Sequence, residues 1–201
     1  MGAWDFVIGI LAGILLACVS YIVQTSRISA IRGKLYGGVA NSTVRRHPIQ
    51  QRFLEMAGKQ IYVMKLAGFL FFGTIVGVEN QIRQMLSDTF EHRPIRFLVL
   101  DLYSVDGVDY SAAETFTRIN RILNAKGVQL VICGVNMESE AGKALRNVGL
   151  FEEDDGITYF QSLNSALEFC ENELLIAFYT QRDAEAETES TPAFLGESTQ
   201  S

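Results

Sequence analysis

The chain begins with a long uncharged stretch, Phe6 to Val23, in which apolar residues follow one another without a polar face. Its length is close to the roughly 20 residues that a helix needs to cross the hydrocarbon core of a bilayer. Basic residues follow the stretch instead of preceding it, unlike the start of a signal peptide. Trp4 and Tyr21 stand near its two ends, where interfacial aromatic residues are favoured. We therefore expect one transmembrane helix, residues 3–24, in preference to a buried helix of a soluble protein.

Downstream of Gln60 the pattern alternates between strand-like and helix-like periods. Four apolar runs predict strands, and the two runs that begin at Ile95 and Val128 are expected to be buried, as strands covered on both faces are. These runs are "QIYVMKLAGFLFF", "IRFLVLDLYSV", "VQLVICGV" and "ITYF", and a hairpin turn at Ala67-Gly68 is expected to divide the first into two strands. Helical spacing connects them at 75–86, 112–123, 141–148 and 163–177. The alternation predicts an α/β domain with a mixed, partly parallel sheet and about four helices.

The helix boundaries also have sequence signals. Gly127 and Gly149 follow helical patterns and are expected to end two of the helices. Glu114 and Arg118 are four residues apart and are expected to pair on the outer face of one helix. Ser111-Ala-Ala-Glu114 has the spacing of a capping box, which predicts Ser111 as the N-cap of that helix.

Composition and charge divide the 201 residues further. Hydrophobic residues make up 48% and charged residues 20%, which allows one buried core of ordinary size. The net charge of -6 is uneven, because residues 24–54 carry Lys and Arg without an acid and residues 183–201 carry acids without a base. We expect a basic juxtamembrane linker at 25–58, a folded domain at 59–181 and a disordered acidic tail at 182–201. The positive-inside rule then places the folded domain in the cytosol.

Several classes of function are disfavoured by the residues present. Cys18, Cys133 and Cys170 are scattered in apolar runs and suit buried thiols better than a disulfide framework. Neither His47 nor His92 has a metal-ligand partner at the required spacing. The basic stretch lacks interleaved aromatics apart from one tyrosine, which disfavours nucleic-acid binding. We expect no metal, no cofactor and no nucleic-acid partner.

The stretch "VDGVDYSAAETF", at 105–116, concentrates polar side chains between a strand pattern and a helix pattern. Asp101, Asp106 and Asp109 have no base, nucleophile or metal motif near them in sequence, and acids are common in turns at strand ends. The chain contains no P-loop, no Rossmann glycine fingerprint and no G-x-S-x-G motif. We therefore do not expect an enzyme.

Three stretches together resemble one known arrangement. "FLVLDLYSVDGVDYSAAETF" resembles the core strand and helix start of the STAS domain, which bacterial anti-sigma-factor antagonists share with SulP-type (sulfate permease family) anion transporters. "LAGFLFFGTIVGVENQI" and "GILAGILLACVSYIVQTSRISAIRG" resemble the transporters' first STAS helix region and their last membrane helix, with fungal members closest. The resemblance implies a STAS-like domain preceded by one transmembrane helix.

The resemblance also implies a function and partners. It suggests the C-terminal regulatory or interaction domain of a SulP-like anion transporter of the sulfate type, in an incomplete transporter chain. The expected partners are the transporter membrane domain or a second STAS domain, together with the lipid bilayer. The expected location is the vacuolar or plasma membrane. A stand-alone membrane-tethered scaffold and a soluble partner switch are the alternatives.

In the antagonists, an aspartate at the strand-to-helix turn precedes a serine that accepts phosphate. Asp109 matches this aspartate, Tyr110 occupies the serine position, and Ser111 follows one residue later. The candidate interaction or phosphorylation residues are therefore Asp106, Asp109, Tyr110 and Ser111, with helix capping as the favoured role of Ser111. A phosphate at this helix N-terminus would meet the positive end of the helix dipole.

Overall fold

The computed structural model describes residues 2–26, 30–37, 41–92, 94–151 and 156–190. Its described part contains a five-stranded sheet with the order β1-β2-β3-β4-β5. The strands are β1 (Ile31–Tyr36), β2 (Ile61–Leu70), β3 (Phe97–Val108), β4 (Gln129–Cys133) and β5 (Thr158–Phe160). β1 runs antiparallel to β2, and the other neighbours are parallel. The predicted α/β fold with a mixed sheet is confirmed.

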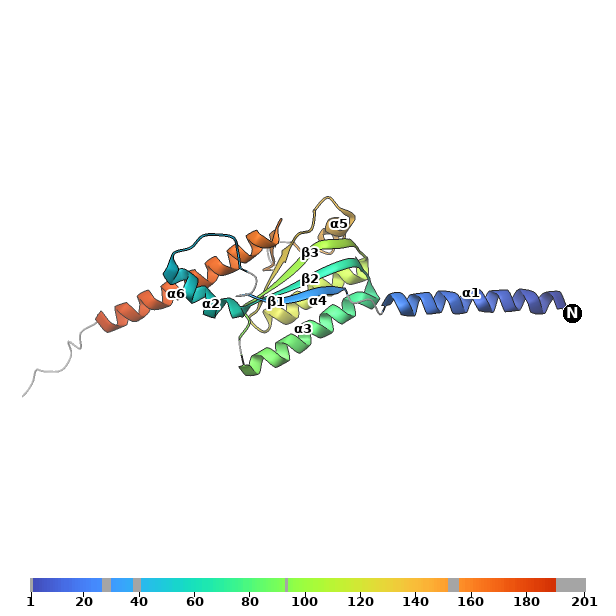
Figure 1. Cartoon of the computed structure of the whole chain (residues 1–201), viewed down its shortest axis with the longest axis horizontal. Helices are drawn as coiled ribbons and strands as arrows, with labels where there is room; N and C mark the ends of the chain where they lie inside the picture. Colours follow the sequence, from blue (N-terminus) through green and yellow to red (C-terminus); the bar gives the residue numbers. More distant parts are fainter. Residues whose placement is uncertain (1, 27–29, 38–40, 93, 152–155, 191–201) are drawn as a thin grey trace, which may run out of the picture.

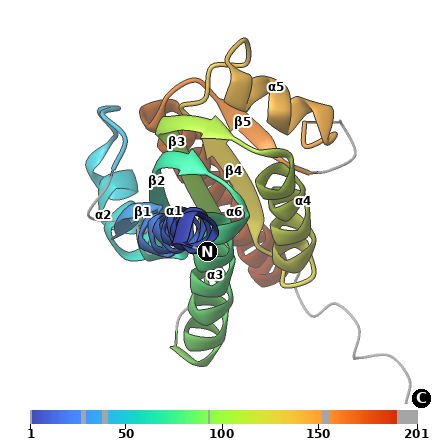
Figure 2. The same cartoon turned by 90° about the vertical axis from the view of Figure 1, so that its right-hand side faces the viewer.

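Helices cover both faces of this sheet (Figures 1 and 2). One face packs against α3 (Phe72–His92), α4 (Tyr110–Asn124) and α5 (Glu140–Asn147). The other packs against α2 (Pro48–Ala57) and α6 (Leu163–Ser190), and the 3-10 turn η1 (Gly58–Gln60) joins α2 to β2. The result is a three-layer α/β sandwich, as parallel strands with crossover helices require.

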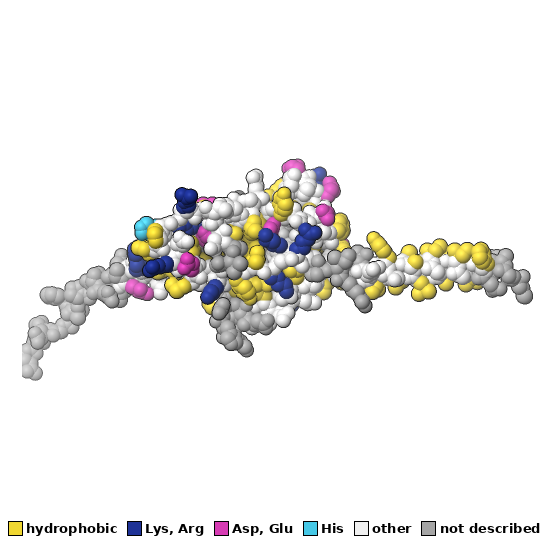
Figure 3. All heavy atoms as spheres, viewed as in Figure 1, with side chains coloured by type: hydrophobic (Ala, Val, Ile, Leu, Met, Phe, Trp, Pro, Cys, Tyr) yellow, Lys and Arg dark blue, Asp and Glu magenta, His cyan; other side chains and the backbone are white. Residues whose placement is uncertain are grey.

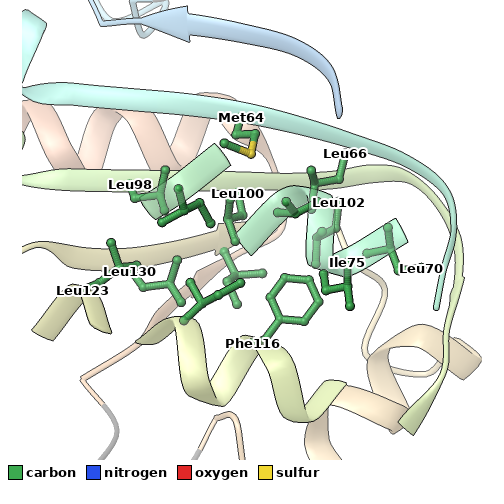
Figure 4. Packing of buried hydrophobic residues seen from close by; sticks show 14 of the residues in the cluster. Met64, Leu66, Leu70, Ile75, Leu98, Leu100, Leu102, Phe116, Leu123 and Leu130 are labelled. Atoms are coloured by element: carbon green, nitrogen blue, oxygen red, sulfur yellow. The ribbon is translucent and has the colours of Figure 1, made fainter. Parts of the chain in front are cut away.

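The larger core lies between the sheet and α3, α4 and α5, and Figure 4 shows its centre. Leu98, Leu100 and Leu102 alternate along β3 toward this face, which is the period of a strand. Phe116 of α4 reaches the sheet from below and is fully buried, next to Ile75 of α3. The apolar side chains of β3, α3 and α4 therefore face one common core.

The N-terminal helix α1 (Gly2–Ser26) stands apart from this core (Figure 1). Within it, Phe6–Gln24 has a mean hydropathy of 2.7 and none of this window is buried in the protein. Figure 3 shows α1 as a rod of hydrophobic side chains next to a folded part with mixed charges. By length and composition, α1 is the one helix of the described part that could cross a membrane.

The expected hairpin turn within the first strand-like run is wrong. Ala67-Gly68 does not form a hairpin, because β2 continues through to Leu70 beside β3. The ladder accommodates the positive φ of Gly68 (79°) with register shifts on both sides of Gly68. A glycine inside a strand pattern thus marks an irregularity here and not a turn.

The segment 25–58, expected as a linker, contributes β1 and α2 to the fold. Its residues 41–46 are attached to α6 through Glu171, a buried carboxylate that accepts hydrogen bonds from the Ser42 amide (2.7 Å) and the Arg46 Nε (3.1 Å). Thr43 is held in the same way by Asn164 (2.8 Å). A sequence without apolar periodicity is therefore ordered by polar contacts that are distant in the chain.

At the other end, α6 continues to Ser190, so that 182–190 is helical where a disordered tail was expected. The sequence of this part, rich in Ala and Glu, has high helix propensity. Residues 191–201 lie outside the described residues. The expected helix ends at Gly127 and Gly149 are confirmed, since both have a positive φ (68° and 76°) directly after a helix.

We expect Phe116→Ala to cause a large loss of stability. This change removes a fully buried ring and leaves a cavity, and we expect it to lower the free energy of unfolding by about 3–5 kcal/mol. Denaturation of the full chain in mild detergent, followed by circular dichroism, measures it. Arg121→Ala, on the exposed side of the same helix, should change the value by no more than about 0.5 kcal/mol. Equal effects of the two changes would contradict this packing.

Candidate functional site

The predicted site lies at the carboxyl edge of the sheet, where β2 and β3 end. The two parallel strands stay paired up to Leu70 and Val108, so the helices that follow them, α3 and α4, begin side by side. We call this end of the sheet, with the first turns of α3 and α4, the carboxyl edge. Open α/β sheets commonly bind ligands and partners at this end of their strands.

Asp109 joins the two helix starts. Its Oδ1 accepts a hydrogen bond from the Ala112 amide (2.6 Å), which makes Asp109 the N-cap of α4. Its Oδ2 accepts from the Phe72 amide at the start of α3 (3.4 Å), and its own amide donates to Leu70 O (2.9 Å). One carboxylate therefore satisfies amides of two helices that would otherwise lack partners.

The expected capping box at Ser111 is wrong. Ser111 lies inside the first turn of α4, and its carbonyl oxygen accepts from the Thr115 hydroxyl (2.9 Å). Asp109, two residues earlier, takes the cap position because its backbone is extended (φ -79°, ψ 167°). The S-x-x-E spacing was present in the sequence, but the end of β3 decided where the helix begins.

The other predicted residues are placed as follows. Ser111 and Tyr110 are exposed, and Asp106 is exposed on the last part of β3. The Glu114 carboxylate hydrogen bonds to the phenol of Tyr110 and raises its pKa. The structure thus brings all four residues to one edge, where Asp109 is committed to helix capping and the others face outward.

A polar groove of about 710 Å³ adjoins Tyr110. It lies between α4 and the end of α5, and Glu114, Arg118, Arg121 and Asn147 contribute to its lining. We call it the α4–α5 groove. It was missed in the sequence because its two sides are about thirty residues apart and neither side carries a motif.

Arg118 does not pair within α4 as expected. It donates two hydrogen bonds to Glu79 Oε2 of α3 (3.1 and 2.6 Å), while Arg83 binds Glu79 Oε1 (2.7 Å). The hydrogen bond from Arg118, followed by that from Arg83, outweighs burial and lowers the pKa of Glu79. This ion-pair cluster ties α3 to α4 beside the groove.

The described residues offer little for covalent or metal chemistry. Burial raises the pKa of Cys133 and of Cys170 to about 12, so both thiols stay protonated and unreactive at neutral pH. Within the described residues no cluster of His, Cys, Asp and Glu could hold a metal ion. The arrangement is suited to recognition by exposed side chains.

The comparisons with known proteins agree with this fold. The STAS domain model matches residues 57–166, and the chain belongs to the STAS domain family. The chain is 43% identical, over 183 residues, to the vacuolar basic amino acid transporter VSB1 of Saccharomyces cerevisiae, covering 89% of this chain and 17% of that protein. It is 27% identical to the probable sulfate transporter 3.5 of Arabidopsis thaliana, covering 81% of this chain and 24% of that protein.

Among solved structures, the chain is similar to the STAS domain of a SulP transporter from Vibrio cholerae. The identity is 20%, the TM-score is 0.46, and the match covers 59% of this chain and 86% of that one. The chain is thus similar to a fungal vacuolar transporter and to a plant protein named as a probable sulfate transporter, and it spans less than a quarter of the length of both.

Because Asp109 caps α4 and Ser111 does not, replacing each by alanine should lower the free energy of unfolding by different amounts. Asp109→Ala should lower the free energy of unfolding by about 1–2 kcal/mol, because it removes the cap of α4. Ser111→Ala should change it by about 0.5 kcal/mol or less, because alanine is favourable inside a helix. Denaturation midpoints measure both losses. Asp109→Asn should lose much less stability than Asp109→Ala, because asparagine is also a favourable N-cap residue. A larger loss at Ser111 than at Asp109 would reinstate the capping box.

The Glu79 cluster predicts a dependence on pH. Because the pKa of Glu79 is lowered from its ordinary value of 4.5, the cluster stabilises the fold above that pH and loses this effect as the pH falls through the lowered pKa. Glu79→Gln should cost about 1–3 kcal/mol at pH 7 and progressively less below pH 4.5. Unfolding curves across pH test this. Glu140→Gln, at an exposed pair, should show no such trend.

Proposed function

We propose that this chain is the membrane-tethered STAS regulatory and interaction domain of a SulP-like transporter. The observation that carries the proposal is the combination of a STAS fold with an apolar helix, Phe6–Gln24, on its N-terminal side. In the proposed organisation 3–24 crosses the membrane and 59–181 is the STAS domain. The segment 25–58 connects the two on the cytosolic side and contributes β1 and α2 to the folded domain, and 182–201 is an acidic C-terminal segment.

The relatives support a transporter and suggest a cargo. The relative with the higher identity is named a basic amino acid transporter of the vacuole, and the other is named a probable sulfate transporter. The chain shares 43% identity with the first relative and 27% with the second. We therefore propose the vacuolar membrane as its location, and a basic amino acid, ahead of a sulfate-type anion, as the cargo of the transporter. Both names belong to transporters, which agrees with a binding role and not with catalysis in this domain.

The partner surface we propose is the α4–α5 groove, which Tyr110 helps to line, together with the exposed Ser111 that follows Tyr110 in α4. The groove combines a carboxylate at Glu114 with the guanidinium of Arg121, so it suits a polar protein surface of mixed charge. Contact with the transporter membrane domain or with a second STAS domain would use these side chains. Phosphate on Ser111 or Tyr110 would add negative charge at this rim and change the contact.

The test uses Ser111→Asp and Arg121→Glu in the complete protein in its own membranes. We expect either change to alter uptake of a labelled basic amino acid into isolated vacuoles several-fold, without changing the amount of protein in the membrane. Glu140→Gln, at an exposed pair of α5, serves as the matched control. Unchanged uptake of both basic amino acid and sulfate in both variants would reject the groove as a regulatory contact.

An immunoblot of carbonate-washed membranes separates the proposal from a stand-alone scaffold. A membrane-bound band several times larger than 22.3 kDa agrees with a transporter. A membrane-bound band near 22.3 kDa would favour a tethered scaffold, and extraction by carbonate would favour a soluble partner switch.

A further inference from the structure

Exposed aromatic side chains are concentrated at one end of the folded domain. Outside α1, five Phe and Tyr side chains of the described part are exposed. Phe69, Phe72 and Tyr110 lie at the carboxyl edge, and Tyr103 lies on β3 two residues beyond Asp101, the last residue of β3 that pairs with β4. Tyr110 belongs to the groove, and the other three, with Val76 one turn further along α3, form what we call the aromatic tip. Their exposed fractions are 56% for Phe69, 67% for Phe72 and 83% for Tyr103.

The tip exists because β2 and β3 are longer than the rest of the sheet. β4 ends at Cys133, opposite Asp101, while β3 continues to Val108 and β2 to Leu70. The ring of Phe69 lies against Gly107 of β3, so closely that a Cβ atom at Gly107 would come within 2.6 Å of it. The glycine thus provides the space in which an exposed ring lies flat on the overhanging strands.

The same end of the domain is attached to α1. β1 is antiparallel to β2, and Ile31 pairs with Leu66, while Ala30 O accepts from the Ala67 amide (2.9 Å). The start of β1 therefore lies on the overhanging part of β2, and Figure 2 shows α1 projecting from the side where β2 and β3 end.

Chain length limits how far this end can lie from a membrane that α1 crosses. From Ser26, the last residue of α1, to Ala30 the chain reaches at most about 14 Å. The rise from Gln24 to Ser26, two residues further along the helix, adds about 3 Å. The headgroup layer is itself about 5–8 Å thick on each side of the hydrocarbon core. The start of β1 thus stays within about 17 Å of that core, and the aromatic tip points beyond it.

Charge does not explain this surface. Arg32 is exposed next to the start of β1, and Asp106 is exposed near the end of β3, so that one cation and one carboxylate offset each other near the tip. Tyr, with an apolar ring and a polar hydroxyl, is suited to the boundary between water and lipid. Phe is among the apolar residues that membrane-surface segments bury in the same layer. A lipid surface therefore fits the tip through its aromatic side chains.

We propose that the aromatic tip lies in the headgroup layer of the membrane that α1 crosses. The lipid surface is then a second contact of the STAS domain, besides the covalent connection through residues 27–30. This contact orients the domain so that the carboxyl ends of β2 and β3 face the membrane. This inference rests on the proposed membrane span of α1. It assigns the tip to lipid and leaves the α4–α5 groove available for a protein partner.

Fluorescence quenching tests the proposal with single tryptophans in the full chain. The chain has one tryptophan, so Trp4→Phe provides a background into which Phe72→Trp, Tyr103→Trp or Met56→Trp is introduced. Met56 is an exposed residue near the start of β2, at the opposite end of the domain, and serves as the control. The proteins are reconstituted into phosphatidylcholine–phosphatidylserine vesicles that contain a lipid with a spin label on its headgroup.

The expected result is a gradient. Phe72→Trp should be quenched most strongly by the labelled lipid, Tyr103→Trp less, and Met56→Trp several-fold less than Phe72→Trp. Added salt should change the quenching little, because charges near the tip offset each other. Equal quenching at all three positions, or none at Phe72 together with full access of aqueous acrylamide, would overturn the proposal. A tip that acrylamide does not reach and the labelled lipid does not quench is covered by protein, which also overturns it.

A separate readout reports on α1. Cys18 lies on the exposed surface of α1, whereas Cys133 and Cys170 are buried. In the same vesicles, protection of Cys18 from a water-soluble maleimide and resistance to carbonate extraction indicate that α1 is inserted. Loss of both means that the proposed membrane span fails. Inserted α1 with an unquenched tip means that only the lipid contact fails.

Discussion

The rest of the structure depends on the parallel pairing of β2 with β3. This pairing is the most extensive in the sheet and runs from Ile61 and Phe97 to Leu70 and Val108. Because both strands end together, α3 and α4 begin together, and their unpaired amides meet at one place. Asp109 satisfies amides of both helices there, so the geometry of the edge depends on one carboxylate at the end of the longest strand.

The same pairing separates two surfaces with different chemistry. Toward α5, the first turns of α4 border the α4–α5 groove, where Tyr110, Glu114 and Arg121 offer hydrogen bonds and charge. Away from it, the overhanging strands and the start of α3 present aromatic rings. A regulatory domain that must face both a membrane and a partner needs two such surfaces. In the proposed arrangement the tether brings them close to the bilayer and leaves the opposite end, with α2 and the C-terminal part of α6, in water.

The ordering of 25–58 shows a second constraint. Glu171 is buried on α6, and removing a carboxylate from water is costly unless charged or polar partners replace the water. Arg46 (3.0 Å) and Ser42 supply those partners, and in doing so they hold the chain between β1 and α2 against the domain. These contacts therefore fix the chain between β1 and α2 within the folded domain, while only four residues separate the end of α1 from β1.

The sequence by itself determined the local patterns: an apolar segment of membrane length, buried strand segments at 97–102 and 129–133, and amphipathic helices whose apolar positions are the core positions of the structure. These follow from local alternation, and the STAS resemblance followed from them. Tertiary structure decided what local patterns leave open. Asp109, and not Ser111, is the N-cap of α4, because β3 extends to Val108. Arg118 binds Glu79 and not its neighbour Glu114, because α3 packs beside α4. Gly68 lies in a continuous strand because β3 pairs with β2 on both sides of it. Residues 31–36, expected in a linker, form the edge strand β1 because β2 supplies their hydrogen-bond partners. Contacts between residues distant in the chain have no local signature, so they appear only when the chain is folded.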